Sequence, residues 1–138
     1  MIRVVLDTSV LVSAVISPTG PNAQVFDLVT EGTIRPYLTE AVLAEYYRVF
    51  EYERLGHLDR RRIARLRGLL ESVSVKVKSR GRLQISGDAE DNRIYECAVA
   101  AKADYIVTEN TKHFKKPYKT TQIVTARQLL MLLEARRA

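Results

Sequence analysis

The chain has 138 residues, of which 46% are hydrophobic and 28% charged, a composition typical of an ordinary globular protein. Its apolar runs are too short to cross a membrane, and its single cysteine, Cys97, excludes an internal disulfide. We therefore expect one domain over residues 1–138 and a reducing, cytoplasmic compartment. The net charge of +6 favours a polyanionic partner, nucleic acid before a membrane surface.

Hydrophobic periodicity and turn residues divide the chain into strands that alternate with helices. In chain order these are a strand at 2–6, a helix at about 23–31, a strand at 34–38, helices at 39–52 and 59–72, a strand at 73–77, a helix at 91–102, strands at 104–108 and 122–125, and a helix at 126–137. This alternation predicts an α/β fold, a three-layer α/β/α sandwich with a mainly parallel central sheet.

A single aspartate, Asp7, interrupts the uncharged stretch at residues 4–17. A secretory signal is disfavoured, because Asp7 breaks the apolar segment that a signal needs and almost no basic segment precedes it. A second explanation is that Asp7, with Thr8 and Ser9, caps a helix after the first strand. Ligands of parallel sheets bind beyond the carboxyl ends of the strands, so Asp7 also stands where a site is expected.

Two further acids are candidates for the same edge of the sheet. Asp91 falls in the middle of the apolar face of the helix at 91–102, where a buried charge is costly unless a cation or donors offset it. Glu45 borders the apolar face of the helix at 39–52, and the alternative for it is a surface acid paired with Arg48.

Acids gathered from distant parts of the chain would repel one another unless a cation lay between them. The group that can converge is Asp7, Glu45 and Asp91, with Asp88 either a helix N-cap or a loop acid. Oxygen ligands without cysteine or clustered histidine suit Mg²⁺ or Mn²⁺. The sequence therefore predicts a divalent metal site at the carboxyl edge of the sheet.

Three segments, in this order, resemble the PIN domain, the nuclease family that includes VapC-type toxins. They are LDTSVLVSA at residues 6–14, LAEYYRV around Glu45, and DAEDNRIYECAVAAKADYIVTENTKHF at residues 88–114. The resemblance implies a metal-dependent endoribonuclease that leaves 5′-phosphate and 3′-hydroxyl ends. It also implies the toxin of a toxin–antitoxin pair, with a small antitoxin as partner, and a homodimer.

The resemblance assigns roles to individual residues. It gives Asp7, Glu45 and Asp91 as catalytic and metal-binding acids, Asp88 and Asn110 as further metal ligands, and Thr8, Ser9 and Glu109 as supporting residues. Asn110 is a departure, because many relatives carry an acid at this position. A neutral amide there, with Glu109 as the nearest substitute, puts a second metal ion in doubt more than the first.

Lysines close to the same sheet edge are candidates for gripping the RNA backbone, namely Lys112, Lys115 and Lys116. A neighbouring histidine, His113, is either an assistant to the chemistry or an exposed loop residue. Two other functions stay open. One is a PIN-fold module that binds RNA or protein with weak or no catalysis, which Asn110 favours. The other is phosphoryl transfer with Asp7 as nucleophile, although the second aspartate of the dehalogenase motif is missing.

Overall fold

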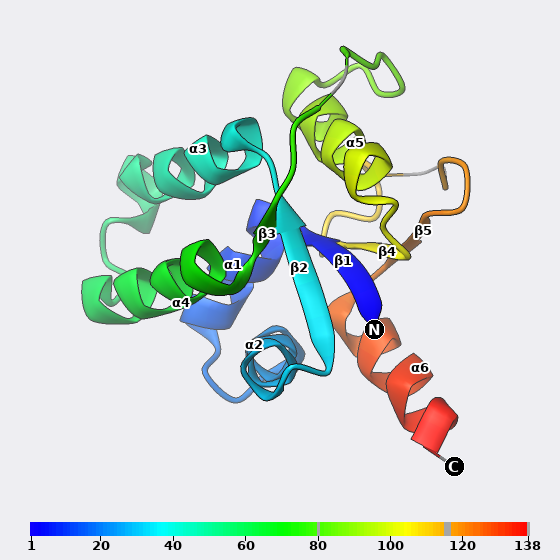
Figure 1. Cartoon of the computed structure of the whole chain (residues 1–138). Coiled ribbons are helices and arrows are strands. Elements are labelled where there is room, and N and C mark those ends of the chain that lie inside the picture. The colour runs from blue at the N-terminus through cyan, green and yellow to red at the C-terminus, as the bar shows by residue number, and fades with distance from the viewer. Residues whose placement is uncertain (80, 115–116, 138) are drawn as a thin grey trace.

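The computed structural model describes residues 1–79, 81–114 and 117–137 of the chain. A five-stranded sheet with the order β3-β2-β1-β4-β5 forms its centre, and all of its neighbouring strands are parallel (Figure 1). The strands are β1 (Ile2–Leu6), β2 (Ile34–Leu38), β3 (Val75–Lys76), β4 (Tyr105–Val107) and β5 (Gln122–Val124). The predicted α/β sandwich with a mainly parallel sheet is confirmed.

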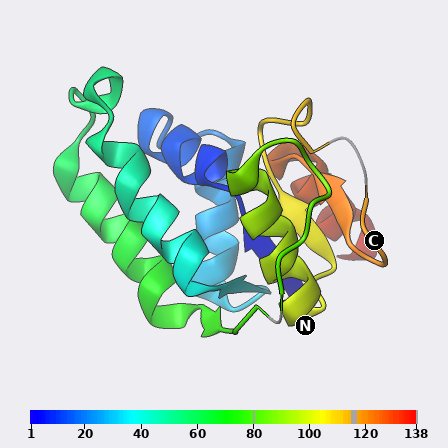
Figure 2. The ribbon, with the colours of Figure 1, turned by 90° about the horizontal axis from the view of Figure 1, so that it is seen from above.

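Helices cover both faces of the sheet. They are α1 (Thr8–Ile16), α2 (Pro21–Glu31), α3 (Glu40–Arg48), α4 (Arg60–Val73), α5 (Ala89–Ala101) and α6 (Ala126–Arg137), with short 3-10 helices η1 (Val49–Glu51) and η2 (Glu53–Leu55). Successive contacts join α6, α2, α1 and α4 in one layer, while α5 packs on β1, β2 and β4 from the opposite side. Figure 2 shows α3 beside α1 and α4, and α5 in front of the sheet.

Apart from shifts of one or two residues at element ends, the observed elements differ from the predicted ones in three places. Helix α1 was missing from the predicted order, because its sequence TSVLVSAVI is apolar on nearly all sides and shows no helical period. The helix predicted to end at residue 52 ends as an α-helix at Arg48 and continues as 3-10 turns. The predicted strand at 73–77 shortens to β3, an exposed two-residue edge strand.

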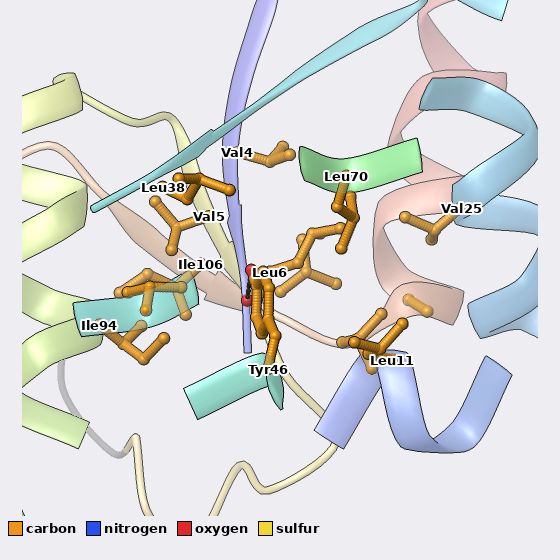
Figure 3. Packing of buried hydrophobic residues seen from close by; sticks show 14 of the residues in the cluster. Val4, Val5, Leu6, Leu11, Val25, Leu38, Tyr46, Leu70, Ile94 and Ile106 are labelled. Carbon is orange, nitrogen blue, oxygen red and sulfur yellow. Dashed lines mark hydrogen bonds between the residues drawn. The ribbon is translucent and has the colours of Figure 1, made fainter. Parts of the chain in front are cut away.

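The core lies where the middle of the sheet meets the two helical layers. Val4, Val5 and Leu6 of β1 are fully buried, and side chains of both layers pack against them (Figure 3). The hydroxyl of Tyr46 in α3 donates a hydrogen bond of 2.6 Å to the carbonyl of Leu6, which fixes α3 against the carboxyl end of β1. Among the described helices, none combines the length and the apolar character that crossing a bilayer would require.

The strand order reverses between β1 and β4. From β1 the chain builds β2 and β3 on one side, and it later returns to place β4 and β5 on the other. Leu6 lies opposite Val107 in the register of these two strands, so Asp7 and Thr108 leave the sheet side by side. Such a reversal leaves a crevice at the carboxyl edge of an open parallel sheet, where ligands bind.

Candidate active site

Asp7 stands at the carboxyl end of β1, and two hydroxyl groups hold its side chain. Ser9 and Thr108 donate hydrogen bonds of 2.6 and 2.8 Å to the same carboxylate oxygen, Oδ2. Asp7 occupies the N-cap position of α1, yet its side chain makes no capping hydrogen bond there. The explanation of Asp7 as a side-chain helix cap is therefore wrong, because Ser9 and Thr108 hold its carboxylate instead.

The same hydroxyls fix the loop that follows β4. Ser9 Oγ accepts a hydrogen bond of 3.0 Å from the backbone N–H of Glu109, and Thr108 Oγ1 accepts one of 2.9 Å from that of Asn110. Thr108 is fully buried. Thr108 was not among the predicted site residues, because a threonine at the end of a strand is ordinary until its spatial neighbour is known.

Asp91 enters the site from the first turn of α5. The N-cap of this helix is Asp88, whose Oδ1 accepts hydrogen bonds of 2.8 and 3.1 Å from the N–H groups of Glu90 and Asp91, which confirms the capping alternative. Asp91 is buried, with 8% of its surface exposed, as its place on the apolar face of α5 predicted.

The carboxylate of Asp91 is poorly compensated. Its Oδ2 is buried and has no hydrogen-bond partner among the described residues, and the imidazole Nδ1 of His113 lies 3.6 Å from it. The pKa of Asp91 is raised from 3.8 to about 6, chiefly by burial and then by the negative charges of Asp88 and Asp7, while His113 acts in the opposite direction. The ionised form of Asp91 is therefore unfavourable in this site, and a bound cation would stabilise it.

Glu45 reaches the site from α3, and the predicted pairing with Arg48 is present. Arg48 donates hydrogen bonds of 2.9 Å from Nε and 2.5 Å from Nη2 to Oε2 of Glu45. The Glu45 side chain is nevertheless only 12% exposed. Partial burial, and then the charges of Glu45 and Asp88, raise the pKa of Glu90 above its usual value, so negative charge is crowded along this edge.

All these acids line one cavity of about 370 Å³. The predicted site residues that it brings together are Asp7, Thr8, Ser9, Glu45, Asp88, Asp91, Glu109 and Asn110. His113 and Arg48 also line it. Lys112 lines a neighbouring cavity of about 420 Å³ that shares Asp88 and Asp91 with the first. Lys115 and Lys116 lie outside the described residues.

The position of Asn110, where many relatives carry an acid, offers no free carboxylate among the described residues. Asn110 is exposed, and the Glu109 side chain is held by Asn22, whose Nδ2 donates a hydrogen bond of 2.5 Å to Oε1. Asn22 is buried at the start of α2 and has no counterpart in the sequence analysis, because nothing in the segment 17–22 links it to residues after β4.

The carboxylates of the cavity could hold a hard divalent cation, although they do not form a complete set of protein ligands. Within the described residues, no three side chains of His, Cys, Asp or Glu are close enough together to hold an ion as they stand. Mg²⁺, however, keeps several waters and needs only one or two protein carboxylates. Asp7, fixed by two hydroxyls, and Asp91, with its unpartnered oxygen and raised pKa, supply that pair.

Sequence comparison identifies relatives of the whole site region. A family model described as PIN domain matches residues 3–112, which include Asp7, Glu45, Asp91 and Asn110. An uncharacterized protein of Methanocaldococcus jannaschii is 30% identical over 104 residues, which are 74% of this chain and 67% of that protein.

Solved structures share the fold. The crystal structure of VapBC2 from Rickettsia felis bound to a DNA fragment from their promoter superposes with a TM-score of 0.57 at 17% identity, covering 88% of this chain and 98% of that one. DNA-bound VapBC from Salmonella typhimurium gives a TM-score of 0.57 at 16% identity, covering 89% and 98%.

Proposed function

Because this chain belongs to the PIN domain family, whose members are generally nucleases, we propose that it is an endoribonuclease dependent on Mg²⁺ or Mn²⁺. The observation that carries the proposal is the pair of Asp7 and Asp91 in one cavity. One carboxylate is held rigidly, and the other has a raised pKa and an unpartnered oxygen. A cation bound between them would relieve the crowding of charge.

A bound divalent ion would lower the pKa of a water molecule and stabilise the charge that builds up on a phosphodiester during hydrolysis. The residues of the chain hold its ligands in place. Ser9 and Thr108 orient Asp7, and Asp88 fixes the first turn of α5 and thereby Asp91. Glu45 completes the acidic wall, and Arg48 places positive charge beside it at the cavity.

The biological setting that we propose is a toxin–antitoxin pair. The sequence resembles VapC-type toxins, and the two solved structures named above, which share the fold, are VapBC assemblies bound to DNA. An antitoxin protein would then cover the acidic cavity. We also propose that the chain forms a homodimer and acts in the cytoplasm. Purification of the chain with the product of an adjacent small reading frame, and loss of RNA cleavage in that complex, would support it.

One observation favours a second candidate function, an RNA- or protein-binding module with weak catalysis. Arg48 is paired with Glu45, Asn110 stands where many relatives carry an acid, and among the described residues no three acidic, histidine or cysteine side chains are grouped to hold an ion. In this alternative, the cavity still binds a cation, but the protein holds an RNA or protein partner without cleaving it.

The decisive experiment is incubation of the purified protein with a structured RNA pool in Mg²⁺, Mn²⁺ or EDTA. Asp7→Asn is the test variant, and Asp27→Asn, an exposed acid on α2, is the matched control. Metal-dependent cleavage by wild type and Asp27→Asn but not by Asp7→Asn supports the nuclease. RNA binding without cleavage by any of the three supports the binding module.

A further inference from the structure

A larger cavity, of about 1080 Å³, lies along the second half of α5, away from Asp91. Its walls come from the loop after β3, from α5, and from the turn at 118–121 before β5. We call it the basic groove and define it by Lys78, Arg82, Val99, Lys102, Tyr118 and Lys119. Figure 2 shows the loop after β3 passing along α5.

The charge of the groove is strongly unbalanced. Four exposed cations line it, namely Lys78, Arg82, Lys102 and Lys119. Among the described residues that line it, the acid is Glu96, which is 6% exposed. Glu96 is already satisfied, because its Oε2 accepts hydrogen bonds of 2.6 Å from Arg93 Nη2 and 2.8 Å from the N–H of Leu83. The groove therefore offers a positive surface to an anion.

The loop wall of the groove is fastened to α5 by buried side chains. Glu96 holds the N–H of Leu83, and Asn92 Oδ1 accepts hydrogen bonds of 3.0 and 2.8 Å from the N–H groups of Ile85 and Ser86. Asn92 Nδ2 also donates a hydrogen bond of 2.9 Å to the carbonyl of Ser86. Asn92 and Glu96 lie four residues apart on one face of the helix, so the wall has a defined position.

An aromatic ring and an apolar surface lie between the cations. Tyr118 is half-buried and contacts the ring of Tyr95 edge-on, with 6.3 Å between the centroids. Lys119 Nζ lies 5.7 Å from the centroid of the Tyr118 ring, and Val99 adds apolar surface from α5. A nucleobase stacks on such a ring, while cations around it contact phosphates.

Three arginines of α4 are engaged in contacts within the fold. In α4, Arg62 donates from Nη2 to the carbonyl of Ala14 at 2.8 Å, and Arg60 Nη1 to that of Phe50 at 2.9 Å. Arg67 stacks over Tyr47 at 4.0 Å from the ring centroid. The groove cations differ from these arginines because they line one open cavity together with the ring of Tyr118.

We propose that the basic groove binds a single-stranded RNA segment on one side of the scissile bond. This inference rests on the proposed nuclease function, because α5 joins the two cavities. Asp91 at its first turn and Lys102 at its end are separated by about 16 Å at a rise of about 1.5 Å per residue. Tyr118 favours an unpaired strand, since a duplex does not offer its base faces for stacking.

The test measures binding of a labelled, unstructured RNA oligonucleotide in EDTA, where metal-dependent cleavage is absent. The variant is Lys78→Gln/Arg82→Gln/Lys119→Asn, with asparagine chosen because residue 119 has a φ of 54°. The control, Arg61→Gln/Arg65→Gln/Arg127→Gln, removes equal charge from exposed positions on α4 and α6. We expect the groove variant to bind the RNA roughly tenfold more weakly. The dependence of log affinity on log salt concentration should also become less steep by about two, because each of the three lost phosphate contacts contributes about 0.7 to that slope for single strands.

A second variant, Tyr118→Leu, is expected to weaken single-stranded binding roughly tenfold and to leave duplex binding unchanged. Equal losses in the groove variant and its control would overturn the proposal. A matching loss of binding to polyglutamate would show a surface for acidic proteins and would also overturn the assignment to RNA.

Cleavage of the same RNA in Mg²⁺ separates the two proposals. If wild type cuts RNA and the groove variant binds as wild type does, the groove inference fails and the nuclease stands. If wild type binds through the groove and cuts nothing in any metal, the nuclease fails, and the groove remains an RNA-binding surface without a scissile bond beside it.

Discussion

Thr108 donates its hydroxyl hydrogen to Asp7 Oδ2 at 2.8 Å, joining residues that are 101 positions apart in the sequence. The same oxygen of Thr108 accepts the N–H of Asn110. One buried hydroxyl therefore links the acid at the end of β1 to the loop after β4. It thus sets both the orientation of the Asp7 carboxylate and the position of Asn110.

Thr108→Val keeps the shape of the side chain and removes the hydroxyl. We expect a loss of about 1 to 2 kcal/mol in the free energy of unfolding, because the N–H of Asn110 loses its acceptor and Asp7 one donor. Cleavage should fall about 10- to 100-fold, as when a partner that orients a metal ligand is removed. Urea denaturation and RNA cleavage rates measure the two effects.

The matched control is Thr39→Val, which removes another buried hydroxyl, one that accepts a hydrogen bond of 3.2 Å from the backbone N–H of Val42 at the start of α3. It should destabilise the fold by a similar amount and leave cleavage unchanged when assayed well below its melting temperature. Thr108→Ser should restore cleavage. Equal cleavage by Thr108→Val and wild type would show that the hydroxyl only stabilises the fold.

Asp91→Asn should stabilise the metal-free protein at neutral pH while abolishing cleavage. The pKa of Asp91 is about 6 in the folded protein against 3.8 ordinarily, so between these values the folded state binds more protons than the unfolded state. Stability therefore falls as the pH rises through this window. The gain from the substitution should be roughly 1 to 2 kcal/mol at pH values above it, since each pKa unit is worth about 1.4 kcal/mol and solvent screening removes part.

The measurement is the free energy of unfolding in EDTA across the acidic range, for wild type, Asp91→Asn and Asp27→Asn. The advantage of Asp91→Asn should shrink as the pH falls below about 6 and vanish near 3.8. The exposed control should show no such trend. A pH-independent difference would mean that Asp91 is not held in an unfavourable charged state.

The positions of the two principal acids followed from the sequence because each breaks a local rule. Asp7 places a charge inside an apolar stretch, and Asp91 places one on the buried face of a helix. Such anomalies can be detected within a few residues. Capping by Asp59 and Asp88 could be predicted for the same reason, since a cap depends on adjacent residues alone.

The residues that sequence analysis missed act over long separations. Thr108, Asn22 and the loop anchors Asn92 and Glu96 are ordinary in their local sequence, and their partners lie on other elements. Helix α1 was missed for another reason: its sequence is apolar on nearly all sides, so it carries no regular alternation of polar and apolar residues. Only the packed fold shows these features.

Glu45 and Arg48 form an ion pair, and Glu45 could bind a metal ion through Oε2 only if its hydrogen bonds to Arg48 were broken. If Glu45 is a ligand, Glu45→Gln should weaken Mn²⁺ binding, and Arg48→Gln should strengthen it by freeing the Glu45 carboxylate from its two hydrogen bonds. Calorimetric titration of the metal-free protein measures both. If neither substitution moves the affinity, Glu45 is an acid paired with Arg48 and takes no part in the metal site.

Asn110→Asp tests the departure from the family pattern. The exposed side chain of residue 110 lines the cavity of Asp7 and Asp91, so a carboxylate there adds an oxygen ligand with a full charge. We expect tighter Mn²⁺ binding, a second bound ion at high concentration, and faster cleavage at limiting metal. Asn110→Ala serves as the comparison, because it removes the amide oxygen and should weaken binding if that oxygen contacts the ion or its water. Identical titrations for both variants and wild type would place residue 110 outside the metal site and leave Asp7 and Asp91 as its only firm protein ligands.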